Sequence, residues 1–358
     1  MMHMFHIKYE KKAERGIRIL VVGCGGAGCN SINRIKKMGI EAETLAINTD
    51  FEHLCSLNAD NKLHIGERIT HGYGAGGSLA VGKECAEEAR DAIRRAVGRR
   101  DIVIVVAGLG GGTGTAVAPV VAEIARELGA IVVCVVTMPF RAERRRTRVA
   151  VEGLRELQAR ADSVIVLDNN RLLEIVPDYP IEQAFSIMDQ IIVDVIMGIT
   201  ETVTKPSMIN IDFSDLRAVL KNSGTSTILY GEGPDSEPER VVAETLRNQL
   251  LDIEYSGAKG AVIHITGGTR MSIQTAYTVM DAITQFLDPE ANVIMGARVD
   301  PEFDGRIRVI AIITGVQSAM LTGKGWNNPG KCAAAIVSMG AESATGRINP
   351  IIKDVMSR

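Results

Sequence analysis

A glycine-rich segment, AGLGGGTGTAVAP over residues 107–119, lies between an apolar run and a segment with helical periodicity. The run before it, DIVIVVA, predicts a buried strand, and VVAEIAREL after it predicts a helix. Five glycines and two threonines leave backbone N–H groups uncovered where that helix begins. Since a helix N-terminus carries positive partial charge, this junction predicts an anion-binding turn, most simply for phosphate.

Short apolar runs alternate with amphipathic helices through the first half of the chain. The expected strands cover 17–26, 42–50, 101–107, 130–139 and 162–169, and the expected helices cover 30–39, 82–97 and 144–160. This alternation is typical of an α/β fold in which helices cover both faces of a Rossmann-like parallel sheet.

The second half changes character. A long, mostly apolar helix is expected from Ile181 to about Thr204, and its all-round hydrophobicity predicts burial between two domains. A β-α-β-α-β-β pattern follows and predicts a smaller α/β C-terminal domain. In its second helix the expected core stripe is Ile273, Ala276, Tyr277, Met280, Ile283 and Leu287. The expected divisions are an N-terminal extension (1–16), a nucleotide-binding domain (17–180), the central helix and a linker (181–209), a C-terminal domain (210–316) and a partly disordered linker and tail (317–358).

Composition narrows the function classes. Charged residues make up 23% and the net charge is −3, so a nucleic acid or an anionic membrane is not the expected partner. The six cysteines form no C-x-x-C pair, which indicates buried, reduced thiols rather than a disulfide framework or a zinc site. No signal peptide precedes the first strand, and no uncharged stretch is long enough to span a bilayer. A cytoplasmic protein without direct membrane insertion is expected.

The first glycine run is ambiguous by itself. Gly23-x-Gly25-x-x-Gly28 follows a strand and opens a helix, and Asp50 comes about 20 residues later, as in a dinucleotide-binding fingerprint. A nicotinamide or flavin site and a merely structural tight turn both remain open at this point. The glycine run at 107–119 favours a third interpretation, a polyphosphate site. Two such loops at the carboxyl edge of one sheet can face a single polyphosphate from two sides.

Several motifs occur together in one order: GCGGAGCNSINRI, INTD, GYGAGG, GLGGGTGT, TMPF and NIDFSDLRAVL. Over roughly residues 17–316 the chain closely resembles the tubulin/FtsZ superfamily, and within it the FtsZ family of prokaryotic cell-division GTPases. Ala116 departs from the family's usual glycine. The resemblance implies binding of GTP and GDP, Mg²⁺ held mainly by the nucleotide phosphates and water, and head-to-tail homopolymers that form the division ring at midcell.

The resemblance also implies which residues contact the nucleotide. These are Gly25, Gly26, Ala27, Gly28, Cys29, Asn30, Asn48, Asp50, Gly74, Ala75, Gly76, Gly77, Gly110, Gly111, Gly112, Thr113, Gly114, Thr115, Pro139, Glu143, Arg146, Asn169, Phe185 and Asp189.

Three of these assignments have a stated reason or an open alternative. Phe185 and Asp189 are spaced i, i+4, so one helix face offers an aromatic ring to a purine and a carboxylate to guanine, although core packing of Phe185 is the alternative. The family has a Glu-x-x-x-Arg pattern after TMPF. Counting forward from Pro139 places its arginine position at Thr147, whereas counting back from Gly153 places it at Arg146. The remaining arginines of FRAERRRTR are explained as well by a solvated helix face as by a role in binding.

The segment Asn210-Ile-Asp212-Phe-Ser-Asp215 carries the expected chemistry. Read locally, Asp212 caps a helix and Asp215 lies in its first turn. The resemblance instead implies that this segment enters the nucleotide pocket of the next subunit, where the two carboxylates polarise a water aimed at the γ-phosphate and Asn210 positions the segment.

The resemblance leaves the cell-level role and the tail open. A cytoskeletal paralogue that does not divide cells fits the same motifs, and a dinucleotide-dependent oxidoreductase fits the first glycine run. The tail lacks the family's usual acidic-hydrophobic terminal peptide, although RINPIIKDVM over 347–356 offers apolar residues for docking a membrane anchor or regulatory protein.

Overall fold

The computed structural model describes residues 16–40, 42–205, 207–209, 211–221, 223–246, 253–254 and 257–318 of the chain. The strands are β1 (Ile19–Cys24), β2 (Glu43–Asn48), β3 (Asn61–His64), β4 (Ile102–Gly108), β5 (Ile131–Met138), β6 (Ser163–Asp168), β7 (Gly224–Pro234), β8 (Ile253–Glu254), β9 (Ala258–Gly267), β10 (Leu287–Val299), β11 (Arg306–Thr314) and β12 (Gln317–Ser318). The N-terminal extension and the tail beyond residue 318 lie outside the described residues, apart from residue 16.

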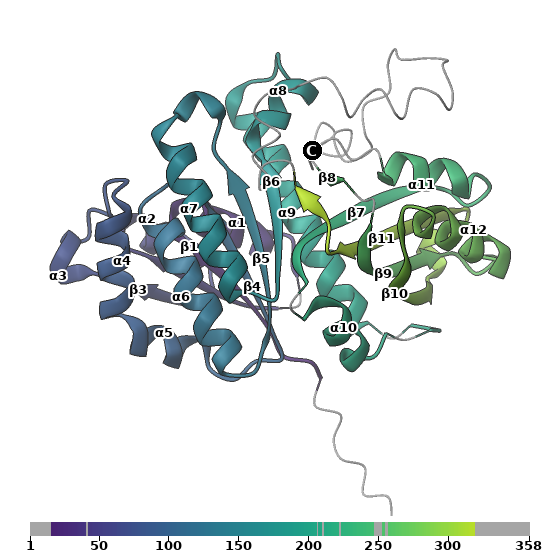
Figure 1. The fold of residues 1–358 in the computed structure, drawn as a ribbon, viewed down its shortest axis with the longest axis horizontal. Coiled ribbons are helices and arrows are strands. Elements are labelled where there is room, and N and C mark those ends of the chain that lie inside the picture. The colour runs from purple at the N-terminus through teal and green to yellow at the C-terminus, as the bar shows by residue number, and fades with distance from the viewer. Residues whose placement is uncertain are drawn as a thin grey trace, which may run out of the picture.

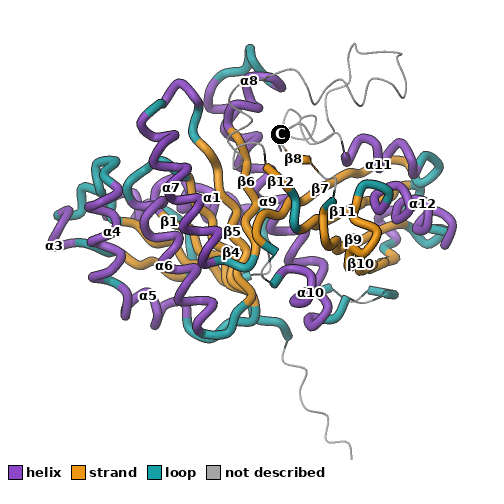
Figure 2. Tube along the Cα trace, viewed as in Figure 1, coloured by secondary structure: helices purple, strands orange, loops and turns teal. Residues whose placement is uncertain are grey.

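Helices precede, follow and connect these strands (Figure 2). They are α1 (Gly25–Lys37), α2 (Phe51–Ser56), α3 (Glu67–Thr70), α4 (Leu79–Glu88), α5 (Arg90–Val97), α6 (Thr113–Glu127), α7 (Arg145–Arg160), α8 (Leu172–Ile175), α9 (Ile181–Thr204), α10 (Phe213–Leu220), α11 (Pro238–Leu246) and α12 (Ile273–Thr284), with 3-10 turns at Arg141–Glu143, Asn169–Arg171 and Pro301–Phe303. The single helix expected over 82–97 is two helices, because the backbone at Ala89 leaves the α region between α4 and α5.

Ten strands form one sheet in the order β10-β9-β11-β7-β6-β5-β4-β1-β2-β3 (Figure 1). All neighbours are parallel except β11, which runs antiparallel to β7 and β9. The part from β6 to β3 has the doubly wound Rossmann order, in which the chain changes direction between β1 and β4. The expected α/β class and parallel sheet are confirmed, and the topology predicts a ligand crevice at the carboxyl ends of β1 and β4.

Side chains alternate between two cores on opposite faces of the sheet. In β1, Ile19 and Val21 pack into the core that contains α1 and α9, whereas Leu20 and Val22 pack into the core that contains α6. β4 repeats this alternation. A strand buried on both faces is apolar throughout, which is why IVIVVA has no polar residue.

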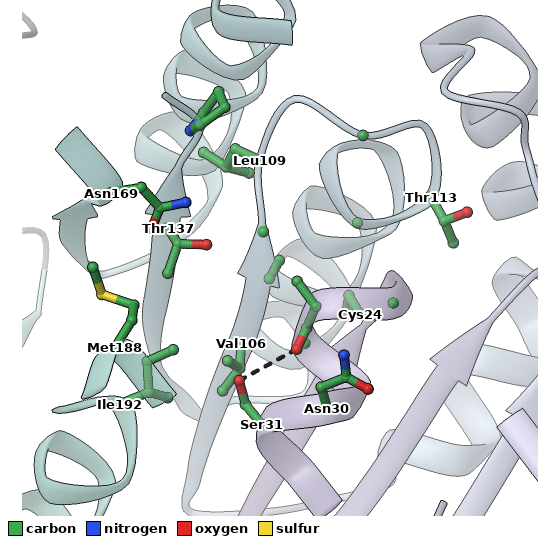
Figure 3. Close-up of a pocket in the computed structure, with 18 of the residues that line it drawn as sticks. Cys24, Asn30, Ser31, Val106, Leu109, Thr113, Thr137, Asn169, Met188 and Ile192 are labelled. Atoms are coloured by element: carbon green, nitrogen blue, oxygen red, sulfur yellow. Dashed lines mark hydrogen bonds between the residues drawn. The ribbon is translucent and has the colours of Figure 1, made fainter. Parts of the chain in front are cut away.

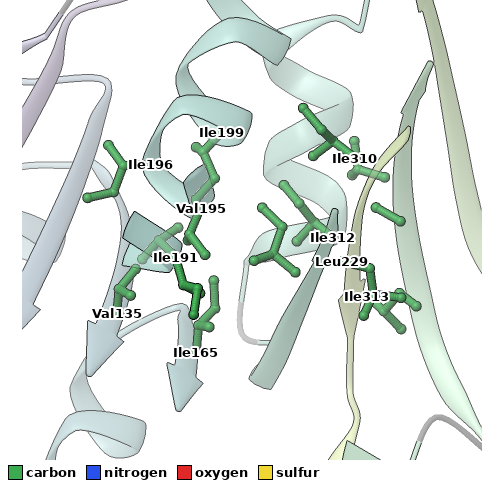
Figure 4. Close-up of a cluster of buried hydrophobic side chains, with 14 of the residues drawn as sticks. Val135, Ile165, Ile191, Val195, Ile196, Ile199, Leu229, Ile310, Ile312 and Ile313 are labelled. Carbon is green, nitrogen blue, oxygen red and sulfur yellow. The ribbon is translucent and has the colours of Figure 1, made fainter. Parts of the chain in front are cut away.

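Helix α9 lies between the two halves of the molecule. Figure 4 shows Ile191 and Val195 of α9 near Val135 and Ile165 of β5 and β6, with Leu229 of β7 beyond them. Among the described residues α9 is the one helix long and apolar enough to cross a membrane, with a mean hydropathy of 1.3. Over half of its most apolar window, 56%, is buried inside the protein, as expected for a core helix between domains.

The C-terminal strands extend the N-terminal sheet rather than forming a separate one. β7 pairs with β6 over only three residue pairs, from Ser163–Gly224 to Ile165–Ser226. One hydrophobic core therefore runs from the α9 face into the C-terminal domain.

The core stripe expected on α12 is partly wrong. Ile273 is 90% exposed and Tyr277 is 64% exposed, whereas Val279, absent from the expected stripe, is fully buried. The buried face runs through Ala276, Val279 and Ile283. Two adjacent faces of this helix are apolar at helical spacing, so periodicity alone does not choose the one that packs.

Candidate functional site

A cavity of about 550 Å³ opens at the carboxyl ends of β1, β4 and β5, a size typical of small-molecule sites. It lies where the sheet topology predicts a ligand crevice. Fourteen of the predicted nucleotide-binding residues line it: Gly26, Ala27, Gly28, Asn30, Gly111, Gly112, Thr113, Gly114, Pro139, Glu143, Arg146, Asn169, Phe185 and Asp189.

The two glycine loops meet at this cavity. Gly25, at φ +69°, lies so close to the second loop that an added Cβ would be 2.6 Å from Gly114 N. Helices α1 and α6 both begin here, and neither Cys24 nor Gly112, their N-cap residues, makes a side-chain capping bond. Two helix N-termini with uncapped N–H groups therefore face one cavity, the arrangement expected for a polyphosphate.

The glycines in these loops serve two different purposes. A Cβ at Gly28 would lie 2.2 Å from Val106 O, and one at Gly112 would lie 2.8 Å from Ser78 O, so these positions allow close packing of the protein on itself. A Cβ at Gly26 or Gly111 would meet no protein atom within 4 Å. Only the second pair keeps space open on the ligand side.

Asn169 and Thr137 lie across the cavity from Asn30 and Ser31 (Figure 3). The Asn169 Oδ1 atom is buried and has no hydrogen-bond partner among the described residues. Such an atom is costly unless a ligand or water satisfies it. Next to it Asp168 accepts from Asn170 N at 2.9 Å, and burial raises the pKa of the Asp168 carboxyl.

Helix α9 supplies one wall of the cavity. Phe185, Met188, Asp189 and Ile192 line it from a single helix face. The Phe185 ring is 40% exposed and packs edge-on against Phe140, so it is not a core residue. Burial raises the pKa of the Asp189 carboxyl, and the charge of Arg34 and a hydrogen bond from Ser31 oppose that shift.

Glu143 and Arg146 form the rim of the cavity and pair with each other through an i, i+3 ion pair. Glu143 also accepts from Phe140 N at 2.9 Å. Thr147 is buried beneath them, with its hydroxyl donating to Phe140 O. Of the two positions that the sequence left open, Arg146 is the one at the cavity.

The remaining predicted nucleotide-binding residues do not line the cavity: Gly25, Cys29, Asn48, Asp50, Gly74, Ala75, Gly76, Gly77, Gly110 and Thr115. Cys29 is fully buried with its thiol directed at Gly23 O and Ile47 O, and burial raises its pKa to about 12. Thr115 braces the second loop by accepting from Gly110 N. Cys29 and Thr115 therefore support the two loops from behind the cavity lining.

Asp212 and Asp215 lie far from this cavity. Both are exposed, Asp212 at the N-cap of α10 and Asp215 in its first turn. The Asp212 side chain makes no capping bond, so the local interpretation does not account for it. Asn210 lies outside the described residues.

The position of α10 is fixed from its other end. Ser223, just beyond α10, donates its backbone N–H to the carbonyl of Asp162, immediately before β6. That is the amino end of β6, whereas the cavity is at the carboxyl ends of the neighbouring strands. Figure 1 shows the same separation, with α10 at the bottom and α8, which follows β6, at the top.

Several lining residues were not among the predicted ones, including Ser31, Thr137, Met188 and Ile192. Helical spacing from Phe185 and Asp189 points to Met188 and Ile192, and Thr137 lies in the TMPF motif at a strand end. Among the described residues, no group of three or more His, Cys, Asp or Glu side chains converges as a metal site.

Comparison with known proteins agrees with this geometry. The family model "Tubulin/FtsZ family, GTPase domain" matches residues 18–177, and "FtsZ family, C-terminal domain" matches 224–317. Cell division protein FtsZ 2 of Methanocaldococcus jannaschii is 51% identical over 322 residues, covering 88% of this chain and 85% of that protein. Cell division protein FtsZ 2 of Halobacterium salinarum is 50% identical over 308 residues, covering 86% of this chain and 78% of that protein.

A solved structure titled "FtsZ dimer, empty (M. jannaschii)" superposes with a TM-score of 0.78 at 43% identity, covering 85% of this chain and 89% of that chain. The dinucleotide-dependent oxidoreductase, which the first glycine run alone left open, does not agree with these matches. The two uncapped helix N-termini fit the triphosphate that a GTPase binds. The chain therefore belongs to the FtsZ family of GTPases.

Proposed function

We propose that this GTPase assembles head to tail and that each hydrolytic site is completed by Asp212 and Asp215 of a neighbouring subunit. The observation that carries the proposal is their location: both are exposed at the end of the molecule away from the cavity. They do not reach the cavity of their own chain, but a translated second copy brings them to it. Asn210 is assigned the positioning of this segment, as the family resemblance implies.

In the same proposal the cavity holds GTP. The phosphates lie on the first turns of α1 and α6, the guanine contacts Phe185 and Asp189, and Asn169 lies beside the ribose. Glu143 and Arg146 close the rim. The orphaned Oδ1 of Asn169 and the uncapped helix N-termini support this arrangement.

Mg²⁺ is assigned mainly to the nucleotide phosphates and water, where it would neutralise charge that develops on the phosphates. The incoming carboxylates orient and polarise the attacking water. Phosphoryl transfer depends on such positioning and electrostatic stabilisation, so a pocket without its neighbour binds GTP but hydrolyses it slowly.

Head-to-tail contacts are heterologous and give open filaments. Because the relatives are named as cell division proteins, we infer that the filaments form the division ring at midcell, in the cytoplasm. A membrane-anchor or regulatory protein is proposed to bind the tail; residues 347–356 lie outside the described part of the chain.

The test is GTP turnover per subunit as protein concentration rises, with light scattering recorded in parallel and ATP and NAD as controls. A split site predicts turnover only above the concentration at which scattering begins. Turnover proportional to protein at every concentration contradicts the proposal.

A mixing experiment tests the division of the site directly. Asp212→Asn subunits keep a cavity, and Gly111→Phe subunits keep the carboxylates while a ring fills the open space beside Gly111. Each variant alone is expected to be inactive, and the mixture is expected to recover turnover. A mixture as silent as its components contradicts a shared site.

A further inference from the structure

A chain of hydrogen bonds runs from the end of β2 to the cavity through His53. Asn48 Oδ1 accepts from Thr49 N at 2.9 Å, and Asn48 Nδ2 lies 3.1 Å from His53 Nδ1. His53 Nε2 then lies 2.8 Å from Asn30 Oδ1. Asn48 is 2% exposed, so this series of hydrogen bonds begins in the protein interior and ends at Asn30, which lines the cavity.

The donors and acceptors in this chain have only one consistent direction. A backbone N–H can only donate, so the atom of Asn48 facing Thr49 N is its oxygen and the amide nitrogen faces His53. His53 Nδ1 is therefore the acceptor, and its proton is on Nε2. Nε2 donates to Asn30, which fixes the Asn30 oxygen toward His53.

The consequence lies at Asn30. With its oxygen held by His53, the Asn30 amide nitrogen is left as a donor, and no described residue accepts a hydrogen bond from it. Asn30 is exposed and lines the cavity beside Ser31 (Figure 3). A free amide donor suits an oxygen or ring-nitrogen acceptor of a nucleotide.

We propose that His53 is a positioning residue for nucleotide binding, which holds the Asn30 amide with its N–H groups toward the ligand. This rests on the proposed function, since it takes the occupant of the cavity to be GTP or GDP. Asn30 touches the nucleotide and His53 acts through it.

The surrounding contacts fix His53 in place. Its backbone N–H donates to Asp50 Oδ1 at 2.9 Å, so Asp50 caps α2 and sets where His53 lies. The neighbouring Thr49 hydroxyl bonds the Thr113 hydroxyl at 2.7 Å, at the start of α6. Residues 48–50 thus support both sides of the cavity, which explains why Asn48 and Asp50 lie behind its lining.

The experiment uses the full chain and measures the Kd for GTP and GDP, by displacement of a fluorescent GTP analogue, together with kcat and KM. His53→Leu removes the donor, and His53→Gln keeps an N–H donor near the position of Nε2. Asn30→Ala removes the ligand contact, and Asn30→Asp keeps the acceptor for His53 while removing the free donor. Melting temperatures are recorded for all variants.

His53→Leu is expected to raise the Kd for GTP about fivefold, the size expected for loss of one hydrogen bond, with kcat unchanged. His53→Gln should stay close to the native Kd, and both Asn30 variants should lose at least as much as His53→Leu. In an Asn30→Ala background, His53→Leu should add nothing, because its effect passes through Asn30.

The inference is overturned if His53→Leu binds GTP normally, if its effect is undiminished without the Asn30 amide, or if Asn30→Ala binds like the native chain. A merely structural His53 would lower the melting temperature and the affinity whether or not Asn30 is present. Failure of the proposed function looks different: the native chain itself would not bind GTP or would not assemble.

Discussion

The two ends of α9 differ in what they carry: the cavity is at one end, and the carboxylates proposed to complete the hydrolytic site are at the other. At its N-terminal end, four residues of one helix face line a cavity where two helix N-termini converge with a buried Asn169 oxygen that no described residue satisfies. Beyond its C-terminal end, two carboxylates stand exposed. With a rise of 1.5 Å per residue, the 24 residues of α9 separate these ends by about 36 Å.

This separation of cavity and exposed carboxylates is the basis for proposing a site shared between subunits. Of the carboxylates that line the cavity, Glu143 is paired with Arg146, and Asp189 is assigned to the guanine in the proposed function. Asp212 and Asp215 are exposed and do not line this cavity. A rigid helix keeps the two apart within one subunit, so a second subunit is the simplest way to join them.

Removing a carboxylate from the far end should have the largest effect. Asp212→Ala is expected to lower GTP turnover about a thousandfold, while GTP affinity and melting temperature stay unchanged because the residue is exposed. Ser214→Ala, on the same exposed turn, is the control and should keep full turnover. Loss of GTP affinity in Asp212→Ala would contradict the comparison, since it would place the residue in its own cavity.

Glycines packed against the protein and glycines beside open space should respond differently to substitution: the first kind should affect stability and the second GTP binding. Gly111→Phe is expected to weaken GTP binding about 100-fold with little change in unfolding free energy, because its side chain enters open space. Gly28→Ala should destabilise the protein by about 3 kcal/mol, because its Cβ would overlap Val106 O. Urea unfolding and GTP titration of both variants check this, and an equally destabilised pair would contradict it.

The buried His264 should make the stability of the protein depend on pH. His264 is 3% exposed and its Nε2 lies 3.2 Å from the hydroxyl of Ser207, in the segment leading to α10. Burial, helped by the charge of Arg298 and opposed by that of Glu201, lowers the pKa of His264 from 6.5 to about 4.

Between these two values the unfolded chain takes up a proton that the folded protein does not. The free energy of unfolding should therefore fall as pH drops from 6.5 to 4, by about 3 kcal/mol in total, with no such dependence above 6.5. His264→Gln should flatten this slope in urea unfolding measured across the range. Parallel slopes for the native chain and the variant would show that another group is responsible.

The smallest effect is expected at Asn169. Asn169→Ala should raise the Kd for GTP about fivefold and leave the stability of the nucleotide-free protein unchanged or slightly higher, because the lost oxygen has no partner in the part of the chain that the structure describes. Calorimetric titration with GTP measures the Kd, and thermal unfolding without GTP measures the stability of the nucleotide-free protein. A destabilised nucleotide-free variant would mean that this oxygen is satisfied within the protein.

The sequence by itself determined the fold class, the positions of most strands and helices, and the family. Apolar strands buried on both faces and glycines at strand–helix junctions are local features, because backbone geometry and hydrophobic periodicity depend on neighbours in the chain. The expected central helix and the strand of IVIVVA match α9 and β4 for this reason.

Only the tertiary structure decided which of these residues line the cavity. Gly28 and Gly111 look alike in sequence, yet one packs against Val106 and the other borders open space, because strands distant in the chain supply the neighbours. Val279 rather than Tyr277 packs in the core because the sheet and α11 lie on that side of α12. Asn48 and Asp50 belong to the predicted nucleotide-binding residues, and the structure places them behind the cavity lining in contact with His53, since side-chain hydrogen bonds follow the three-dimensional arrangement rather than the motif.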